Sequence, residues 1–310
     1  MTPATVASRS FIFLLWAGCA LALLVPMPGL EAGRVADYAR DFLHVPLFAL
    51  LTWSLWRTGI RRAWALATVF LAMGLVEVIQ PWVGREAEAR DALFGAAGSA
   101  MAVALSAAFR TPDPRKRAAW RSLVLVLGAA VLLPLWLVML DRWEARREFP
   151  VLASFRAPLE PGRWKGQGCS MERVKSAGRS ALRLTVLPGA DYPGVFLVEA
   201  PRDWAGMRCL EITMAWPGPG PREFWVRADD RPGSPPYADR VQVSTIVRPG
   251  IQRWSVPLDA LSVTPGGRPF DFSRVVSLGV FMGEGRAGER FDLLGIRLAP
   301  GTNRPGAARQ

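Results

Sequence analysis

Five side chains suited to chemistry lie at or beside the ends of long apolar stretches early in the chain. They are His44, Glu77, Gln80, Arg85 and Asp91. An imidazole next to carboxylates can act as a general acid or base, and a guanidinium can hold a carboxylate or phosphate through two hydrogen bonds. Ionisable groups are costly to keep beside membrane-length segments, so they mark candidate functional positions. We therefore predict that His44, Glu77 and Asp91 are catalytic and that Gln80 and Arg85 bind substrate.

The same positions also have a structural interpretation, which the residues alone leave open. Glu77 paired with Arg85 would lock the topology, and His44 would be an interfacial side chain. Asp91 opens an apolar segment, where an acidic residue stabilises the start of a helix.

Five apolar segments must position these groups, and a helix needs about 20 mostly apolar residues to span a bilayer. The predicted membrane helices are 10–28, 42–58, 63–81, 91–109 and 121–141. Gly95 and Gly98 follow Asp91 on one face of the fourth helix, and small residues at that spacing let neighbouring membrane helices approach closely. We predict that the second, third and fourth helices pack together and bring the polar groups to one rim.

The formal net charge of +12 is not an indication of nucleic-acid binding, and we predict no such partner. Much of this charge lies in two loops between predicted helices, where Arg and Lys set topology. The other two loops mix acidic and basic residues. The prediction is an inner-membrane protein with a cytoplasmic N-terminus and with residues 141–310 outside. The basic loops contain Arg57, Arg61 and Arg62 in one case and Arg110, Arg115, Lys116, Arg117 and Arg121 in the other.

Short motifs around these residues resemble the VanZ-like family of membrane proteins over residues 10–110. The stretch Asp41-Phe42-Leu43-His44, then Phe48-Ala49-Leu50-Leu51, resembles that family's opening motif. The order Glu77-Val78-Ile79-Gln80, Gly84-Arg85 and Asp91 resembles its Glu-x-x-Gln, Gly-Arg and Asp signature. Gly95 stands where the family commonly has Asn, which removes one polar group. The family is named for a protein linked to glycopeptide resistance, so the resemblance implies a cell-envelope role without supplying a reaction.

Beyond residue 148 the pattern changes to short alternating stretches separated by Pro- and Gly-rich turns, which is typical of an antiparallel β-sandwich. We predict a membrane domain over 1–148, a β-sandwich over 149–300 and a flexible tail over 301–310. The predicted strands are Ser180–Val186, Val195–Glu199, Cys209–Trp216, Glu223–Ala228, Arg240–Val247, Arg253–Pro257, Val275–Phe281 and Phe291–Leu298.

The second domain resembles the galactose-binding-like jelly rolls of carbohydrate-binding modules over residues 155–298. The resemblance rests on the order Asp203-Trp204, Asp229-Asp230, Tyr237–Arg240, Trp254–Leu258 and Phe291–Leu298. It implies that Trp225, Tyr237 and Trp254 are candidates to stack on sugar rings. A Trp on an alternating strand is more often a core residue, which is the alternative interpretation. Asp292 is open to two interpretations, as a ligand of a structural calcium ion or as an ordinary turn residue.

Other chemistry has little support in the sequence. We find no Gly-x-Ser-x-Gly elbow, no Cys-x-x-Cys pair, no phosphate-binding Gly-rich loop and no histidine after His44. We expect no metal and no cofactor. Cys169 and Cys209 both fall in the predicted outer domain, where either a disulfide or two free thiols is possible.

Three functional interpretations follow. The first is an envelope protein of the inner membrane whose β-sandwich binds or positions a glycan or an envelope partner. The second is a membrane-embedded hydrolase or transferase that acts on a lipid-linked or anionic headgroup through His44, Glu77, Asp91 and Arg85. The third is a structural assembly or anchoring protein. The sequence leaves the oligomeric state open.

Overall fold

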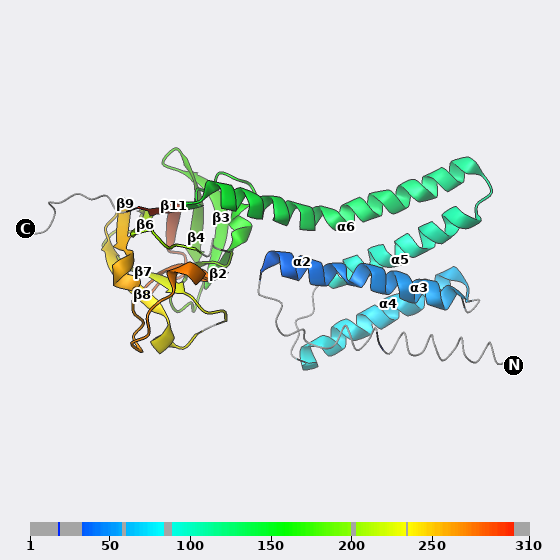
Figure 1. Ribbon diagram of the computed structural model, residues 1–310, viewed down its shortest axis with the longest axis horizontal. Helices are drawn as coiled ribbons and strands as arrows, with labels where there is room; N and C mark the ends of the chain where they lie inside the picture. The colour runs from blue at the N-terminus through cyan, green and yellow to red at the C-terminus, as the bar shows by residue number, and fades with distance from the viewer. Residues whose placement is uncertain are drawn as a thin grey trace, which may run out of the picture. The chain divides into compact units, whose positions relative to one another are not determined.

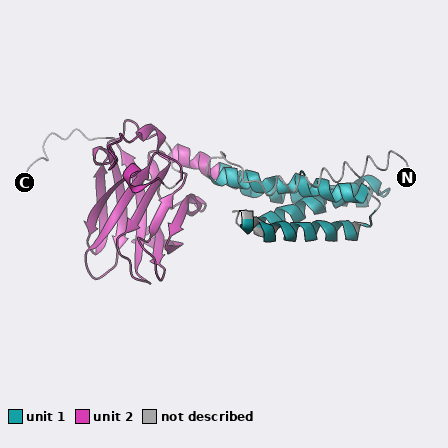
Figure 2. Cartoon of the chain, turned by 90° about the horizontal axis from the view of Figure 1, so that it is seen from below, with its two compact units in different colours: residues 1–139 teal, residues 140–310 magenta. Residues whose placement is uncertain are grey.

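The computed structural model describes residues 18, 33–57, 60–83, 89–199, 203–233 and 235–300. The chain divides into two compact units, Met1–Met139 and Leu140–Gln310 (Figure 2). The first predicted helix, 10–28, lies outside the described residues except for residue 18, and Arg85 and the predicted tail 301–310 lie outside them entirely.

The first unit is helical (Figure 1). Its elements are α2 (Arg34–Phe42), α3 (His44–Arg57), α4 (Arg62–Ile79), the short 3-10 helix η1 (Gln80–Val83), α5 (Ala89–Arg110) and the first part of α6 (Pro114–Glu148). α3 packs against α4 and α5. α3 and α5 run in the same direction, because His44 faces Asp91 at their starts and Arg110 lies over the Trp56 ring near their ends.

Two of the described helices are long and apolar enough to cross a membrane, at Arg90–Arg110 and Pro114–Glu148. The apolar stretch Ala63–Val76 of α4 is shorter, and α3 has 14 residues, which rise only about 21 Å against an apolar bilayer core of about 30 Å. Five membrane helices are therefore not confirmed by length and composition.

The helix limits also differ from the sequence-based expectation at two places. The mixed-charge stretch before His44, expected to be a loop, forms α2 and joins α3 through a turn at Leu43. α6 extends beyond the predicted span 121–141 at both ends and continues to Glu148.

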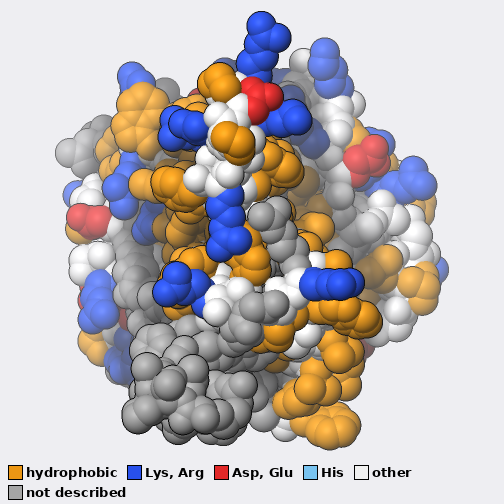
Figure 3. Space-filling view, turned by 90° about the vertical axis from the view of Figure 1, so that its right-hand side faces the viewer, with side chains coloured by type: hydrophobic (Ala, Val, Ile, Leu, Met, Phe, Trp, Pro, Cys, Tyr) orange, Lys and Arg blue, Asp and Glu red, His pale blue; other side chains and the backbone are white. Residues whose placement is uncertain are grey.

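Basic side chains gather at one end of the helical unit. The turns between α3 and α4 and between α5 and α6 carry exposed Arg57, Arg61, Arg110, Arg115 and Lys116. Figure 3 faces these turns and shows Lys and Arg side chains around hydrophobic ones. Since α3 and α5 both end here, the His44–Asp91 end of these helices is the opposite one.

The second unit is a two-sheet antiparallel β-sandwich, so the predicted fold class of this domain is confirmed (Figure 2). One sheet has the order β3-β4-β11-β6-β9 with β1 added beside β11, and the other has the order β2-β5-β10-β7-β8. The strands are β1 (Val151–Ala153), β2 (Trp164–Gln167), β3 (Cys169–Ser176), β4 (Arg179–Val186), β5 (Gly194–Leu197), β6 (Cys209–Trp216), β7 (Arg222–Asp229), β8 (Val241–Val247), β9 (Gly250–Pro257), β10 (Ser277–Met282) and β11 (Arg290–Ala299).

Alternating apolar residues of both sheets fill the core between them. On β6 every second residue is buried, from Leu210 to Trp216, and β7 contributes Phe224 and Val226. Phe224 contacts Phe291 of the other sheet edge-to-face, with ring centroids 5.0 Å apart. Burying one face of each strand at roughly 25 cal/mol per Å² of apolar surface is what holds the sheets together.

The eight predicted strands are all present, and three more, β1, β2 and β3, were not predicted. β3 is an outer strand whose residues are mostly exposed and include Glu172, Arg173 and Lys175, so its sequence does not alternate between apolar and polar. β1 and β2 are only three and four residues long.

A buried ion pair joins the end of α6 to the sandwich. Asp141 is fully buried and Arg163, at the end of the 3-10 helix η2 (Glu160–Arg163), is 2% exposed. Arg163 donates to Asp141 Oδ1 from Nε at 3.0 Å and from Nη2 at 2.7 Å. Burial alone would lower the pKa of Arg163, but the hydrogen bonds to Asp141 and the surrounding negative charges together raise it above its ordinary value. The last turns of α6 therefore belong to the sandwich, which is why the second unit begins at Leu140 and not at the expected residue 149.

We expect Asp141→Ala to lower the free energy of unfolding of the second unit by about 3–5 kcal/mol, because it leaves a buried guanidinium without its counter-ion. Urea unfolding of the full chain in detergent, followed by tryptophan fluorescence, measures this loss. The matched control is Arg231→Ala, which removes the ion pair between Asp239 and a side chain that is 56% exposed, and which should cost no more than about 1 kcal/mol. Equal losses in the two variants would contradict the junction's role.

Candidate functional site

The structure brings two of the predicted catalytic residues together. His44 begins α3 and Asp91 lies in the first turn of α5, and His44 Nε2 is 3.6 Å from Asp91 Oδ2. Both side chains are buried. Arg85 and the side chains of Glu77 and Gln80 lie outside the described part of the structure. The predicted rim is thus represented by the His44–Asp91 pair.

Close helix packing buries this pair. A Cβ at Gly98 of α5 would overlap the carbonyl oxygen of Val45, and a Cβ at Gly95 would overlap Phe48 and Met73. α3 and α5 can approach this closely only because α5 has glycine at both positions. The tight packing expected from the spacing of these glycines behind Asp91 is confirmed.

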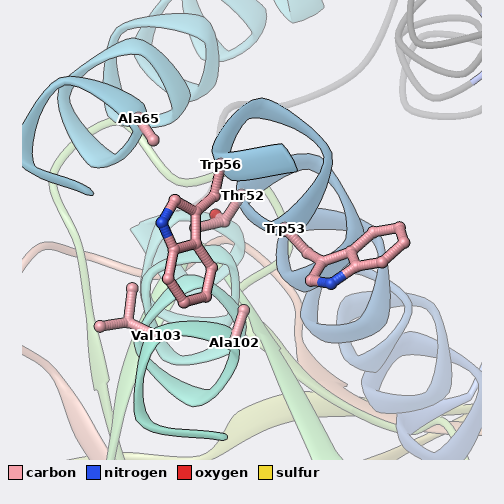
Figure 4. Close-up of a pocket in the computed structure, with 6 residues that line it drawn as sticks. All are labelled: Thr52, Trp53, Trp56, Ala65, Ala102 and Val103. Carbon is pink, nitrogen blue, oxygen red and sulfur yellow. The ribbon is translucent and has the colours of Figure 1, made fainter. Parts of the chain in front are cut away.

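A small cleft lies at the other end of α3, between α3, α4 and α5. In Figure 4 the Trp56 side chain points between α4 and α5, while Trp53 points away from them. The Thr52 hydroxyl is buried and has no hydrogen-bond partner among the described residues. Thr52 follows His44 by about two helical turns, roughly 12 Å, so the cleft is separate from the His44–Asp91 pair. Its lining residues are Thr52, Trp53, Trp56, Ala65, Ala102 and Val103.

Three aromatic rings form a row on the outer face of the five-stranded sheet. Trp225 of β7 and Phe281 of β10 are directly paired, and their ring centroids are 6.4 Å apart with the planes within 6° of parallel. Phe196 of β5 lies 6.4 Å from Phe281 with the planes 19° apart. Tyr192, just before β5, contacts Phe281 edge-on and is exposed. We call Trp225, Phe281 and Phe196 the aromatic row.

The Phe196 ring lies down on the sheet. It is paired with Gly279 of β10, and a Cβ at Gly279 would overlap the ring. Glycine at this position therefore leaves the space that Phe196 fills, in the way that a strand glycine is often covered by a cross-strand aromatic. The Phe196 ring thus covers Gly279 on the outer face of the sheet.

Polar side chains flank the aromatic row on neighbouring strands. Strand pairing sets Ser244 beside Trp225, Gln242 beside Arg227 and Lys165 beside Phe196 on the same outer face. The Arg227 guanidinium lies 5.7 Å from the centre of the Phe196 ring. Hydroxyl, amide and cationic groups thus surround the rings.

A buried carboxylate holds Arg227 in this position. Its Nε donates to Asp229 Oδ1 at 2.9 Å. Burial raises the pKa of the Asp229 carboxyl, although Arg227 acts in the opposite direction. This hydrogen bond therefore fixes the Arg227 guanidinium beside the Phe196 ring.

The other two predicted sugar-binding aromatics lie away from the row. Trp254 belongs to β9 of the six-stranded sheet, where it is paired with Ile212 and packs partly buried against the core, in agreement with its alternative interpretation. Tyr237 is exposed in the 3-10 helix η3 (Tyr237–Asp239). Arg268 fixes that turn by donating to Asp239 and Asp230.

The remaining polar candidates have structural partners. Arg183 binds both carboxylate oxygens of Asp292, at 2.8 and 2.9 Å. Burial would raise the pKa of Asp292, but the hydrogen bonds from Arg183 and Ser176 and the charge of Arg183 together hold the pKa below its usual value. Cys169 and Cys209 are free thiols. In the described residues no group of three or more His, Cys, Asp or Glu side chains is placed to hold a metal ion.

Phe196 and Phe281 were missed as site residues by the sequence analysis, which singled out Trp225 alone of the three. The alternation of inward and outward side chains along each strand already contained this information. On β10, Leu278, Val280 and Met282 point into the core, so Phe281 must point out. An outward aromatic on each of three adjacent strands is the pattern that could have identified the row.

No family model matches the sequence, so the VanZ-like resemblance has no support of that kind, and no curated protein matches it. Among solved structures, a family 11 carbohydrate-binding module from Clostridium thermocellum is 17% identical with a TM-score of 0.37, covering 48% of this chain and 94% of the module. A carbohydrate-binding module that recognises mannan is 18% identical with a TM-score of 0.31, covering 48% of this chain and 95% of the module. An exo-β-agarase is 15% identical with a TM-score of 0.41, covering 49% of this chain and 25% of the agarase. At these identities and TM-scores the likenesses carry no argument about a ligand, and the site has to be judged on its own geometry.

We expect Gly98→Ala to destabilise the helical unit by about 1–3 kcal/mol, because the added methyl meets backbone, which cannot rotate away. The thermal unfolding midpoint of the full chain in detergent measures the effect. Gly74→Ala on α4 is the control, since a Cβ there has open space within 4 Å. A Gly98→Ala chain as stable as Gly74→Ala would contradict the packing described here.

Proposed function

We propose that this chain is a membrane-anchored protein of the cell envelope whose β-sandwich binds a glycan on the outer face of the five-stranded sheet. The observation that carries the proposal is the aromatic row, three nearly parallel rings with one on each of three adjacent strands.

The row has the chemistry that a sugar ring requires. The apolar C–H face of a pyranose can pack on an aromatic face, which removes apolar surface of both from water. The hydroxyl groups at the rim of the sugar need donors and acceptors, and Ser244, Gln242 and Arg227 supply them beside the rings. Binding sites generally combine apolar walls with a few fixed polar groups of this kind.

Folding alone does not account for the row. The inner faces of the two sheets already contain the buried core, so the outward positions of β5, β10 and β7 are free to be polar. Large aromatic side chains grouped on an outward face are a feature of interaction sites.

The membrane part of the proposal rests on the exposed apolar surface of the helical unit. Trp64, Leu71, Leu75, Leu125 and Trp136 are each more than half exposed. A bilayer would cover such side chains, and the basic turns at one end of the unit match the cytoplasmic side under the positive-inside rule. The proposal includes a five-helix, VanZ-like bundle in the inner membrane, with the N-terminus in the cytoplasm and the sandwich outside.

We expect alkaline phosphatase, which is active only outside the cytoplasm, to be active when it is fused after Arg147 and inactive when it is fused after Arg62. The reason is that the basic turns stay in the cytoplasm while α6 crosses the membrane. Enzyme activity in intact cells, normalised to the amount of each fusion protein, is the measurement. The reverse pattern would put the sandwich in the cytoplasm and end the envelope proposal.

We expect Trp225→Ala to weaken glycan binding at least tenfold, about 1.4 kcal/mol or more, because it removes the largest ring of the row. Calorimetry of the full chain in detergent against β-glucans and peptidoglycan fragments measures the affinity. Ile251→Ala is the control, because it removes an exposed apolar side chain from β9 of the other sheet. Binding that is lost equally in both variants, or in neither, would rule out the aromatic row as the site.

A further inference from the structure

The start of α3 and α5 contains buried polar atoms with no hydrogen-bond partner among the described residues. His44 is 4% exposed and Asp91 is 5% exposed. His44 Nε2 and Asp91 Oδ1 make no hydrogen bond, and the distance of 3.6 Å from Nε2 to Oδ2 is longer than a hydrogen bond. Leaving buried polar atoms unpaired destabilises a fold, so such atoms call for an explanation.

The other ring nitrogen of His44 fixes where a proton must be. Nδ1 lies 3.0 Å from the backbone carbonyl oxygen of Asp41, and a carbonyl can only accept a hydrogen bond. Nδ1 therefore carries a hydrogen. In a neutral ring Nε2 would then carry a lone pair and no hydrogen. Nε2 and the Asp91 carboxylate would both be hydrogen-bond acceptors, and no hydrogen bond could form between them.

Charged side chains of α2 and α5 lie near the ring. The described charged groups at this position are the carboxylates of Asp41 on α2 and Asp91 on α5, and the guanidinium of Arg90, whose Nη1 lies 3.6 Å from Asp41 Oδ2. The described side chains that α4 and α6 pack against α3 here, Met73 and Val131, are apolar. A proton on Nε2 would place a cation beside the Asp91 carboxylate. An uncompensated buried charge is among the costliest features a fold can carry.

We propose that His44 and Asp91 form a buried acid–base site, in which His44 is protonated on both ring nitrogens and directs Nε2–H toward the Asp91 carboxylate. The ligand of this site is a proton. The proposal rests on the helical unit alone and does not depend on glycan binding by the sandwich.

This form of the ring is the one that a general acid needs. When Nε2–H gives its proton to an oxygen of a bound group, the N–H bond breaks, its electron pair stays on the nitrogen, and an O–H bond forms. The ring is then the neutral Nδ1–H form, which remains hydrogen-bonded to the Asp41 carbonyl. The headgroup chemistry considered for His44 and Asp91 from the sequence would require this behaviour.

The chain has one histidine, so the site can be observed directly. Nitrogen-15 NMR of the full chain, labelled with ¹⁵N-histidine in detergent micelles at pH 7, distinguishes the charged ring from each neutral tautomer. We expect a doubly protonated ring in the unsubstituted chain and a neutral Nδ1–H ring in Asp91→Asn. Asp37→Asn, which removes a half-exposed carboxylate from α2, should leave the spectrum unchanged.

The unsubstituted chain alone can overturn the proposal, even if Asp91→Asn does not fold. A neutral ring at pH 7, of either tautomer, would show that the pair holds no extra proton and would favour a purely structural role. A charged ring that persists in a folded Asp91→Asn chain would show that Asp91 is not its partner. Neither result bears on the binding of glycans to the aromatic row.

Discussion

The period of two along a β-strand is the constraint on which the arrangement of the sandwich depends. Each strand must turn one set of alternate residues into the core, and those positions are occupied by Leu210, Ile212, Phe224, Val280 and similar side chains. The other set must then point outward, whatever its composition. Phe196 covers Gly279 and so contributes to packing, whereas the core between the sheets does not require an aromatic side chain at Phe281 or Trp225. This separation between the two faces is what allows a binding surface to be distinguished from packing.

A different constraint governs the helical unit, where burial is achieved through the close approach of α3 and α5. Because Gly95 and Gly98 bring the two backbones together just below Asp91, the imidazole of His44 and the carboxylate of Asp91 are enclosed at the starts of their helices. Enclosure removes the water that would otherwise pair with both groups. Gly95 and Gly98 therefore cause the burial of the His44–Asp91 pair, although neither glycine carries a polar side chain.

The sequence predicted features that depend on periodicity and missed those that depend on neighbours far along the chain. Strong alternation located eight strands, whereas β3 lacks alternation because it lies at a sheet edge with charged residues on both sides. The spacing from Asp91 to Gly98 predicted tight packing, which the structure confirms. Cross-strand neighbours such as Phe281 beside Trp225 depend on strand order, which alternation does not reveal. The Asp141–Arg163 ion pair likewise could not be predicted, because the sequence alone does not indicate that the end of α6 packs against the sandwich.

The two candidate sites, the His44–Asp91 pair and the aromatic row, lie in different units of the chain. In the sandwich, Asp292 is held by Arg183, Asp230 by Arg268, and Glu211 by Arg297 and Arg253. The pKa of Glu211 is lowered chiefly by its hydrogen bond from Arg297. Burial would raise the pKa values of Asp230 and Asp292, but their hydrogen bonds and the charge of the paired arginine together lower them. A carboxyl that acts as a general acid needs the opposite shift. Burial does raise the pKa of Asp229, but Arg227 already binds its carboxylate. Burial likewise raises the pKa of Glu148 at the end of α6. The chain's one histidine lies in the helical unit, so the acid–base proposal concerns that unit and the binding proposal concerns the sandwich.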